Sequence, residues 1–145
     1  MSTARALEAI KSRLLAHPLA ARGMARFAWE GGDRPPNNAP WLLATVEFGL
    51  EVVTIGKING RRRRTRPGVL QIFTCAPKRD GVVAALPAAE QAKIMFDFAC
   101  LTTVEPEERL RFDAASVLTD PPIKDLKDAY AAALTTATFE FTYFS

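Results

Sequence analysis

The residues with the clearest chemical potential lie in the stretch NGRRRRTRPG, which spans positions 59–68. Its five arginines are Arg61, Arg62, Arg63, Arg64 and Arg66. Guanidinium groups pair bidentately with phosphate oxygens, so a cluster of them favours nucleic-acid binding. The same charge can steer docking onto an acidic protein surface, or it can be solvated on an exposed segment where salt screens the repulsion. Composition leaves these uses open, and a nuclear-localisation signal is a further interpretation of low specificity.

The basic character of the chain is local. The formal net charge is +3, and the arginine run supplies five positive charges, which leaves the remainder slightly acidic. A chain of this kind does not present a uniformly basic surface. Any anionic partner is therefore expected at one place on the molecule.

Candidate catalytic residues are sparse. The single histidine, His17, directly follows a predicted helix and is expected at the surface, where it can favour the negative helix end when protonated. Three glutamates, Glu105, Glu107 and Glu108, lie in the polar segment VEPEERL, where solvation explains them. No nucleophile is paired with a base. We therefore expect a protein that is not an enzyme.

Cofactor and metal ligands are equally sparse. Cys75 and Cys100 have apolar neighbours, which predicts buried free thiols, and one histidine with two cysteines gives no usual metal site. The segment GKINGR lacks the glycine spacing of a phosphate-binding loop. Trp29 and Trp41 flank a proline-rich segment, where they could pack on each other, and packing in or just below the core is expected in preference to base stacking. We expect no cofactor.

No targeting segment is apparent. The longest apolar runs fall well short of the roughly 20 residues of a membrane helix. The first 20 residues lack the continuous apolar stretch of a secretory signal. We expect synthesis and folding in the cytoplasm and no membrane partner.

Two helices are predicted. Residues 3–16 have apolar side chains at helical spacing and are expected to stop before Pro18. Residues 77–99 carry a second helix, with its regular part starting near Pro87 because proline suits the first turn. Its main apolar contacts are expected from Ile94, Met95 and Phe98.

The remaining periodicity is of the β type. Strands are predicted at 26–30, 41–55 with a bulge or bend at Gly49, 69–76, 109–117 and within 132–145, where Phe139, Phe141 and Tyr143 alternate with polar residues. Residues 56–68 are predicted as the long tip of a hairpin, 31–40 as a loop, and 121–128 as a polar connection or short helical turn. The arginines would then lie on the exposed tip.

This order of elements predicts the fold class. Locally paired strands with two helices that must cover one apolar sheet face predict an α+β fold. In detail we expect a two-layer sandwich in which a mixed or antiparallel sheet with a long hairpin packs against two helices. Residues 1–145 are expected to form a single domain.

Several stretches, taken in order, resemble one family. They are RFAWEG, a proline-rich segment, APWLLATVEF, GRRRRTRPGVLQIFTCAP, a glycine (Gly81) before an alanine-rich helix, and the terminal FEFTYF. The segment PWLLATV and the spacing of Gly68, Leu70, Ile72 and Pro77 carry most of the weight. Over about residues 5–145 the chain resembles the tail terminator proteins of long-tailed phages, the group that includes the lambda tail terminator, and related proteins of phage-like gene transfer particles.

The resemblance implies a structural protein of the virion neck. Such a protein assembles as a ring, commonly a hexamer, that caps the head-proximal end of the tail tube and stops its polymerisation. It docks the major tail tube protein on one side and a head-completion (stopper) protein on the other, and DNA passes through without sequence-specific binding. Arg61, Arg62, Arg63, Arg64 and Arg66 are then candidates for an assembly interface. The alternative from another class is a small cytoplasmic nucleic-acid-binding module that uses the run Arg61–Arg66.

Overall fold

The computed structural model describes residues 2–31, 39–119 and 130–145. Within these ranges the helices are α1 (Ser2–Leu14), α2 (Pro18–Ala21) and α3 (Leu86–Phe96), with two 3₁₀ turns, η1 (Lys78–Asp80) and η2 (Val82–Ala84). The strands are β1 (Ala25–Phe27), β2 (Trp41–Phe48), β3 (Val52–Ile58), β4 (Arg61–Pro77), β5 (Cys100–Thr102), β6 (Arg109–Phe112), β7 (Ser116–Thr119) and β8 (Tyr130–Phe144). The predictions for 121–128 and for most of 31–40 lie outside the described residues.

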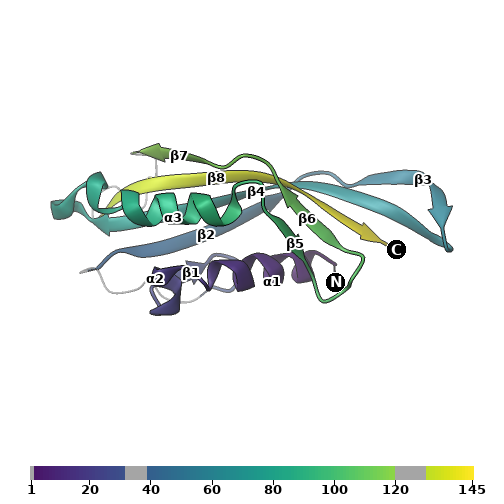
Figure 1. Ribbon diagram of the computed structural model, residues 1–145, viewed down its shortest axis with the longest axis horizontal. Coiled ribbons are helices and arrows are strands. Elements are labelled where there is room, and N and C mark those ends of the chain that lie inside the picture. The colour runs from purple at the N-terminus through teal and green to yellow at the C-terminus, as the bar shows by residue number, and fades with distance from the viewer. Residues whose placement is uncertain (1, 32–38, 120–129) are drawn as a thin grey trace.

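The strands form one sheet, in the order β1-β2-β4-β8-β6-β5, with β3 also paired to β4 and β7 to β8. Every pair is antiparallel except β1 with β2. The long strands β4 and β8 stay in unbroken register from Arg63 opposite Phe144 to Pro77 opposite Tyr130. Figure 1 shows them as the spine of the molecule, with helices α1 and α3 lying along part of its length. This mixed, mainly antiparallel architecture agrees in outline with the expected α+β class.

Strands β2 and β3 occupy successive lengths of the same edge of β4. The chain bends between them at Gly49, whose backbone N–H donates a hydrogen bond of 2.8 Å to the carbonyl of Pro67. A Cβ at Gly49 would come within 2.9 Å of Cγ of Pro67, so the close approach depends on glycine. The predicted break at Gly49 is confirmed, since β2 ends at Phe48 and β3 begins at Val52.

The connection from β3 to β4 is a two-residue turn. Asn59 and Gly60 have φ values of 50° and 78°, the pair of left-handed conformations that a type I′ turn requires. The prediction of a long tip over 56–68 is wrong, because β3 continues to Ile58 and β4 begins at Arg61. The arginine run is therefore part of a strand.

Strand β3 contains a bulge. Its register against β4 shifts between Val53 and Lys57, so residues 54–56 lie opposite Arg63 alone. Extra residues on one strand interrupt the ladder and push side chains away from the sheet. The side chain of Ile55, at the centre of the bulge, is 94% exposed.

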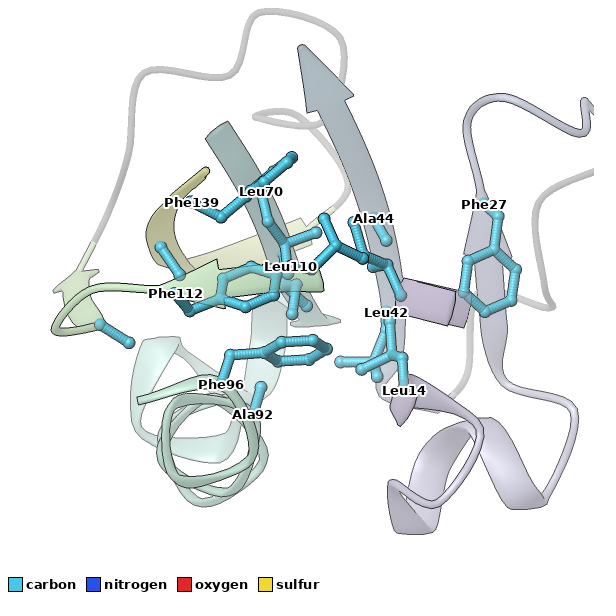
Figure 2. Close-up of a cluster of buried hydrophobic side chains, with 14 of the residues drawn as sticks. Leu14, Phe27, Leu42, Ala44, Leu70, Ala92, Phe96, Leu110, Phe112 and Phe139 are labelled. Atoms are coloured by element: carbon cyan, nitrogen blue, oxygen red, sulfur yellow. The ribbon is translucent and has the colours of Figure 1, made fainter. Parts of the chain in front are cut away.

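The main core lies between the helices and one face of the sheet. Figure 2 shows Leu14 and Phe96 reaching from α1 and α3 toward strand side chains that include Leu42, Leu70 and Leu110. The ring of Phe96 lies 5.3 Å from that of Phe112, and Phe112 lies 5.0 Å from Phe139. The core is thus contributed by both ends of the chain.

Both predicted helices form, with corrections to their details. Helix α1 ends at Leu14, earlier than expected, and Pro18 starts the short helix α2 instead of only ending the first. Pro87 lies in the first turn of α3, as predicted.

The buried face of α3 differs from the prediction. Its buried residues are Ala89, Ala92 and Phe96. Of the three predicted contacts, Met95 packs half-buried against the core, whereas Ile94 and Phe98 are exposed. The predicted contacts were the large side chains, whereas the buried face follows the helical spacing of Ala89, Ala92 and Phe96. The small alanines at helical spacing let α3 approach the sheet closely, which leaves the larger Ile94 on the outer face.

The prediction of one strand over 109–117 is also wrong. The chain leaves the ladder after β6 and returns as β7, and both strands pair with β8. Between them the backbone N–H of Ala115 donates to Asp97 Oδ1 at 2.8 Å, and that of Asp113 donates to the carbonyl of Thr138. The C-terminal alternation is confirmed, since Phe139 and Phe141 are buried while Thr138 and Glu140 are exposed.

Candidate assembly surface

The exposed end of the sheet is formed by residues 50–66, which we call the arm. It comprises the two residues before β3, β3 itself, the turn at Asn59, and the first six residues of β4. Figure 1 shows β3 and this part of β4 extending beyond helices α1 and α3. All seven side chains of β3 are exposed.

Strand alternation divides the arginine run between the two faces of the sheet. Because the register of β4 with β8 is unbroken, even-numbered residues share the face of the buried Leu70 and Ile72, which is the face covered by the helices. Arg62, Arg64 and Arg66 therefore point to the helix side, and Arg61 and Arg63 point to the opposite side. The run is not one cluster of charge.

Arg64 and Arg66 are held by contacts within the chain, Arg64 inside the arm and Arg66 to residues that precede it. Arg64 Nη1 lies 3.0 Å from Glu51 Oε2, and Glu51 also accepts a hydrogen bond from the hydroxyl of Tyr143. Arg66 donates from Nε to the carbonyl of Gly49 at 2.9 Å, and its guanidinium lies 5.3 Å from the ring centre of Phe48. These two arginines have structural contacts within the chain.

The remaining cations of the arm are less constrained. Arg61 forms an ion pair with Glu107, and both side chains are about half exposed, so the pair contributes little to stability. Lys57 and Arg62 lie directly opposite each other in the β3–β4 register. Among the residues that the structure describes, Lys57, Arg62 and Arg63 have no anionic partner. Adjacent like charges without an anion disfavour the isolated arm.

The arm also exposes aliphatic side chains, which the sequence analysis did not single out. Leu50 is 89% exposed, and the other exposed residues are Val52, Val53, Ile55 and Ile58. The register places Val53 on the helix side, opposite Arg64, and Val52 and Ile58 on the other side, opposite Thr65 and Arg61. Both faces of the arm therefore expose apolar side chains, a feature that favours contact with a partner. The sequence did contain a signal: the apolar segment 50–58 is paired across a two-residue turn with a segment of arginines, which cannot cover it.

A hollow of about 600 Å³ lies at the base of the arm, on the face away from the helices, and we call it the back-face hollow. Its cations are Arg63, Arg109 and Arg111, and Phe144 contributes an aromatic ring. Arg111 lies 3.7 Å from Glu140, a weak and exposed pair. Arg109 and Arg111 are alternate residues of β6, so both lie on one face of the sheet. Their spacing in the sequence is the signal by which they could have been predicted.

A second, larger concavity lies between α1 and β5, and we call it the α1–β5 groove. Its volume is about 840 Å³, and its apolar lining includes Ala9, Leu101 and Val104, of which Val104 is 88% exposed. Strand β5 is the last strand in the sheet order, so this groove borders an edge of the sheet.

One end of this groove is held by an ion pair. Arg5 binds Glu108 through two hydrogen bonds, Nε to Oε1 at 2.8 Å and Nη2 to Oε2 at 2.7 Å, and Thr103 donates to the same carboxylate. The hydrogen bonds from Arg5 hold the pKa of Glu108 below its ordinary value, although burial opposes this. Glu108 is buried, so the expectation that solvation explains all three glutamates is wrong for this one.

His17 is also buried, contrary to its expected surface position. Its Nδ1 accepts a hydrogen bond of 3.1 Å from the backbone N–H of Leu19, which caps α2, and its Nε2 lies 2.9 Å from the carbonyl of Ala88. The neutral tautomer with a proton on Nε2 satisfies both contacts. Burial lowers the pKa of His17, because the charged form would lose both water and the cap. The two hydrogen-bonding contacts give His17 a structural role at the start of α2.

The cysteines and tryptophans have structural surroundings as well. Cys75 is a buried free thiol as predicted, and burial raises its pKa to about 12, but Cys100 is exposed on β5. The two tryptophans belong to separate clusters: Trp29 packs on Phe27 with ring centres 5.3 Å apart, and Trp41 packs with Cys75 on the other face of the sheet. Both tryptophans therefore pack in or beside a core cluster, as expected, Trp29 against the main core and Trp41 in a separate one.

The described part of the chain offers neither a cluster of metal ligands nor a membrane-spanning helix. Residues 2–31, 39–119 and 130–145 contain no group of three or more histidine, cysteine, aspartate or glutamate side chains placed to hold a metal ion. Within the same ranges, no helix is both long and apolar enough to cross a membrane.

Comparison with known proteins bears on the fold alone. No protein-family model matches the sequence, and no curated protein is similar to it. A solved structure that carries only a sequence identifier as its description is similar in fold, with a TM-score of 0.72. The alignment covers 100% of this chain and 99% of the other at 17% sequence identity. The architecture therefore also occurs in a chain with a very different sequence.

Proposed function

We propose that this chain is a structural assembly protein that forms a ring and terminates a phage-type tail. In this role it caps the head-proximal end of the tail tube, stops tube polymerisation and offers a face to a head-completion protein. Its place is the neck of a phage or a phage-like transfer particle. This function requires no catalytic group, because it depends on the shape of two binding surfaces and on their affinity for neighbouring proteins.

The observation that carries this proposal is the arm. Exposed aliphatic side chains, and cations with no anionic partner among the described residues, lie on one projecting end of the sheet. Exposed apolar side chains on this scale are unfavourable in water and favour a protein partner that covers them. Together with the resemblance of the sequence to tail terminators, this supports assembly as the role of the arm.

The body of the molecule fits this role as a rigid support. We propose a two-layer sandwich in which α1 and α3 cover one face of the sheet and the long β2–β3–β4 hairpin extends from it. Supporting this, both helices bury side chains in a single core with the strands, including Ile10, Leu14, Ala92 and Phe96. A firmly packed body holds the arm at a fixed angle to its partner.

The test is the morphology of particles made without this chain. Deletion of its gene from the producing genome should yield tails of uncontrolled length that are not joined to heads, as seen by negative-stain electron microscopy. Complementation with the wild-type chain should restore uniform tails. Tails of normal length that still carry heads would refute the proposal.

A second candidate is a nucleic-acid-binding module, favoured by the back-face hollow. Three arginines, Arg63, Arg109 and Arg111, line it beside the ring of Phe144 and outnumber the two lining carboxylates, Glu107 and Glu140. Cations beside an aromatic ring are the combination that holds the backbone and a stacked base of a single strand. Binding of this kind falls steeply with salt. Replacement of these three arginines with serine should abolish salt-sensitive binding of a labelled oligonucleotide. Absence of binding by the wild-type chain at moderate salt would exclude this function.

A further inference from the structure

We propose that the back-face hollow is a binding site for a nucleoside monophosphate, either free or as the end of a single strand. In this site the phosphate lies between Arg63 and Arg109, and the base stacks on the ring of Phe144. The inference rests on the second candidate function for the class of its ligand, and it narrows that ligand from a strand to one nucleotide. It is independent of the ring function, which is carried by the arm.

The strand register places the groups that line the hollow in rows across three strands. On the face away from the helices, Arg63 of β4 lies opposite Phe144 of β8. The next row pairs Thr142 of β8 with Arg109 of β6. Neighbouring rows on one face of a strand are about 7 Å apart. Because β8 lies between β4 and β6, the two guanidinium groups come from either side of the ring of Phe144 and the hydroxyl of Thr142.

Both central guanidinium groups are available to an anion. Within residues 2–31, 39–119 and 130–145, the exposed side chain of Arg63 makes no hydrogen bond or ion pair. Arg109 donates from Nη1 to the carbonyl of Pro106 and, at 2.8 Å, to that of Glu108. These carbonyls hold the group in place without neutralising its charge, and among the described residues Nε and Nη2 of Arg109 are unused. A positioned guanidinium with free donors suits phosphate oxygens.

The ends of the hollow are balanced in charge, whereas its centre is not. Toward the turn of the arm Glu107 is bound to Arg61, and toward the body Glu140 lies 3.7 Å from Arg111. These pairs leave the two central guanidinium groups without a carboxylate. A phosphate monoester carries a charge of about −1.5 to −2 at pH 7, whereas each phosphate inside a strand carries one negative charge. The two central cations therefore match a monophosphate better than an internal phosphate, and further phosphates along β8 would lie against a carboxylate.

The size and the apolar wall of the hollow suit one base. Its volume of about 600 Å³ is within the usual range for small-molecule sites, about 300–1,000 Å³. The half-buried ring of Phe144 is a platform on which a base can stack, and the guanidinium of Arg61, 5.7 Å from the ring centre, helps to fix it. Ile58 adds an apolar side chain to the same lining. The hollow therefore offers a contact to each part of a nucleotide.

Cys100 gives a direct measure of occupancy, because it is exposed and lines the hollow. The other cysteine, Cys75, is buried, and burial raises its pKa to about 12, so iodoacetamide should label Cys100 alone. Deoxyadenosine 5′-monophosphate (dAMP) should slow this labelling in a saturable manner at low salt, as measured by mass spectrometry. Deoxyadenosine and inorganic phosphate, which each lack one contact, should bind about tenfold more weakly or less. Absence of saturable protection by dAMP would overturn the inference.

Two substitutions separate the phosphate contact from the base contact. Arg63→Ser should weaken protection by dAMP about tenfold. Arg62→Ser removes the adjacent cation, which points to the helix side, and is the matched control that should leave protection unchanged. Phe144→Leu should weaken protection by dAMP and leave that by inorganic phosphate unchanged. Circular dichroism checks the fold of each variant, and equal protection in Arg63→Ser and Arg62→Ser would contradict the proposed phosphate contact.

Oligonucleotides distinguish the two sources of the ligand and separate this inference from the function on which it rests. Stronger protection of Cys100 by 5′-phosphorylated oligo-dA than by the unphosphorylated strand would assign the site to the end of a strand. Protection by dAMP with no binding of either strand would assign it to a free nucleotide and exclude the nucleic-acid-binding function. Equal protection by the two strands would overturn the inference and leave that function standing. The ring function is tested separately, by particle morphology.

Discussion

Strand β4 passes through two environments, and its two halves share the same secondary structure but differ in the burial of their side chains. From Gly68 to Pro77 most side chains are buried between β2, β8 and the helices. From Arg61 to Pro67 the strand has the same hydrogen-bonded neighbours in kind, β3 and β8, but most of its side chains are in solvent. The backbone ladder alone therefore does not distinguish core from arm; the helices that cover one half and not the other do.

Gly68 marks the border between the halves, and the largest effect is expected there. A Cβ at this position would lie 2.3 Å from Cζ of Phe139, whose ring is buried against Phe112. Gly68→Ala must displace this ring and should lower the free energy of unfolding by about 3 kcal/mol. Gly56→Ala is the matched control on the arm, where a Cβ meets nothing within 4 Å. Urea titration compares the two; equal costs would show that the border is not where we place it.

The Arg5–Glu108 pair should give the next largest effect. Glu108→Gln leaves Arg5 without its bidentate partner and should cost about 2 kcal/mol, reduced from a fully buried pair because the Arg5 side chain is 31% exposed. Since the folded pKa of Glu108 is lowered, its stabilisation is present above the unfolded pKa, about 4.3, and is lost as pH falls through the lower folded pKa.

The gap in unfolding free energy between wild type and Glu108→Gln should therefore narrow below about pH 4. Glu107→Gln, which touches only the exposed pair with Arg61, is the control and should change stability by less than about 0.5 kcal/mol. A gap that stays constant down to strongly acidic pH would contradict the assignment.

His17 should make a smaller, pH-dependent contribution to the free energy of unfolding. Its folded pKa is lowered, so the unfolded chain binds a proton below about pH 6.5 while the folded chain does not. Stability should fall with decreasing pH between about 6.5 and the lower folded pKa, by at most about 1.4 kcal/mol per pH unit.

His17→Asn keeps a side-chain acceptor for Leu19 and should remove this slope. Because His17 is the only histidine of the chain, no other histidine masks the effect. Thermal unfolding in a series of buffers between pH 5 and pH 7 measures it, and an identical slope in the variant would refute the role.

The smallest effect on stability is expected in the arm itself. Arg62→Ser with Arg63→Ser removes cations without partners among the described residues, so the free energy of unfolding should change by less than about 0.5 kcal/mol. Arg64→Ser with Arg66→Ser breaks contacts with Glu51, Gly49 and Phe48 and should cost about 1–2 kcal/mol. Differential scanning calorimetry compares the two double variants. Equal losses of stability would contradict the distinction between arginines with contacts inside the chain and arginines without them.

Features of the fold that depend on periodicity were predictable from the sequence, whereas those that depend on contacts between distant segments were not. The alternation of Phe139 and Phe141 places the last strand correctly because one face of that strand is buried along its length. The buried face of α3 was misjudged, since spacing of the small Ala89 and Ala92 counted for less than the size of Ile94. His17 was misplaced because its burial depends on Ala88, 71 positions away.

The candidate surface was predicted in part for the same reason. Composition identifies the arginine run, but only the register shows that Arg64 and Arg66 have contacts within the chain while Arg62 and Arg63 have no anionic partner among the described residues. The exposed Ile55 is of the same residue type as a core isoleucine, and only the absence of covering helices over the arm distinguishes it.

The bulge at residues 54–56 has a consequence for a cell that makes this chain in quantity. A bare outer strand rich in valine and isoleucine is the kind of segment that seeds cross-β fibrils, because each added strand renews the template. In β3, residues 54–56 lie opposite the single residue Arg63 of β4, so the row of outward-facing amides and carbonyls is interrupted halfway along the strand. A strand from another copy cannot form backbone hydrogen bonds with β3 along its whole length. The arm therefore keeps exposed apolar side chains for binding while growth of a cross-β fibril from β3 is hindered.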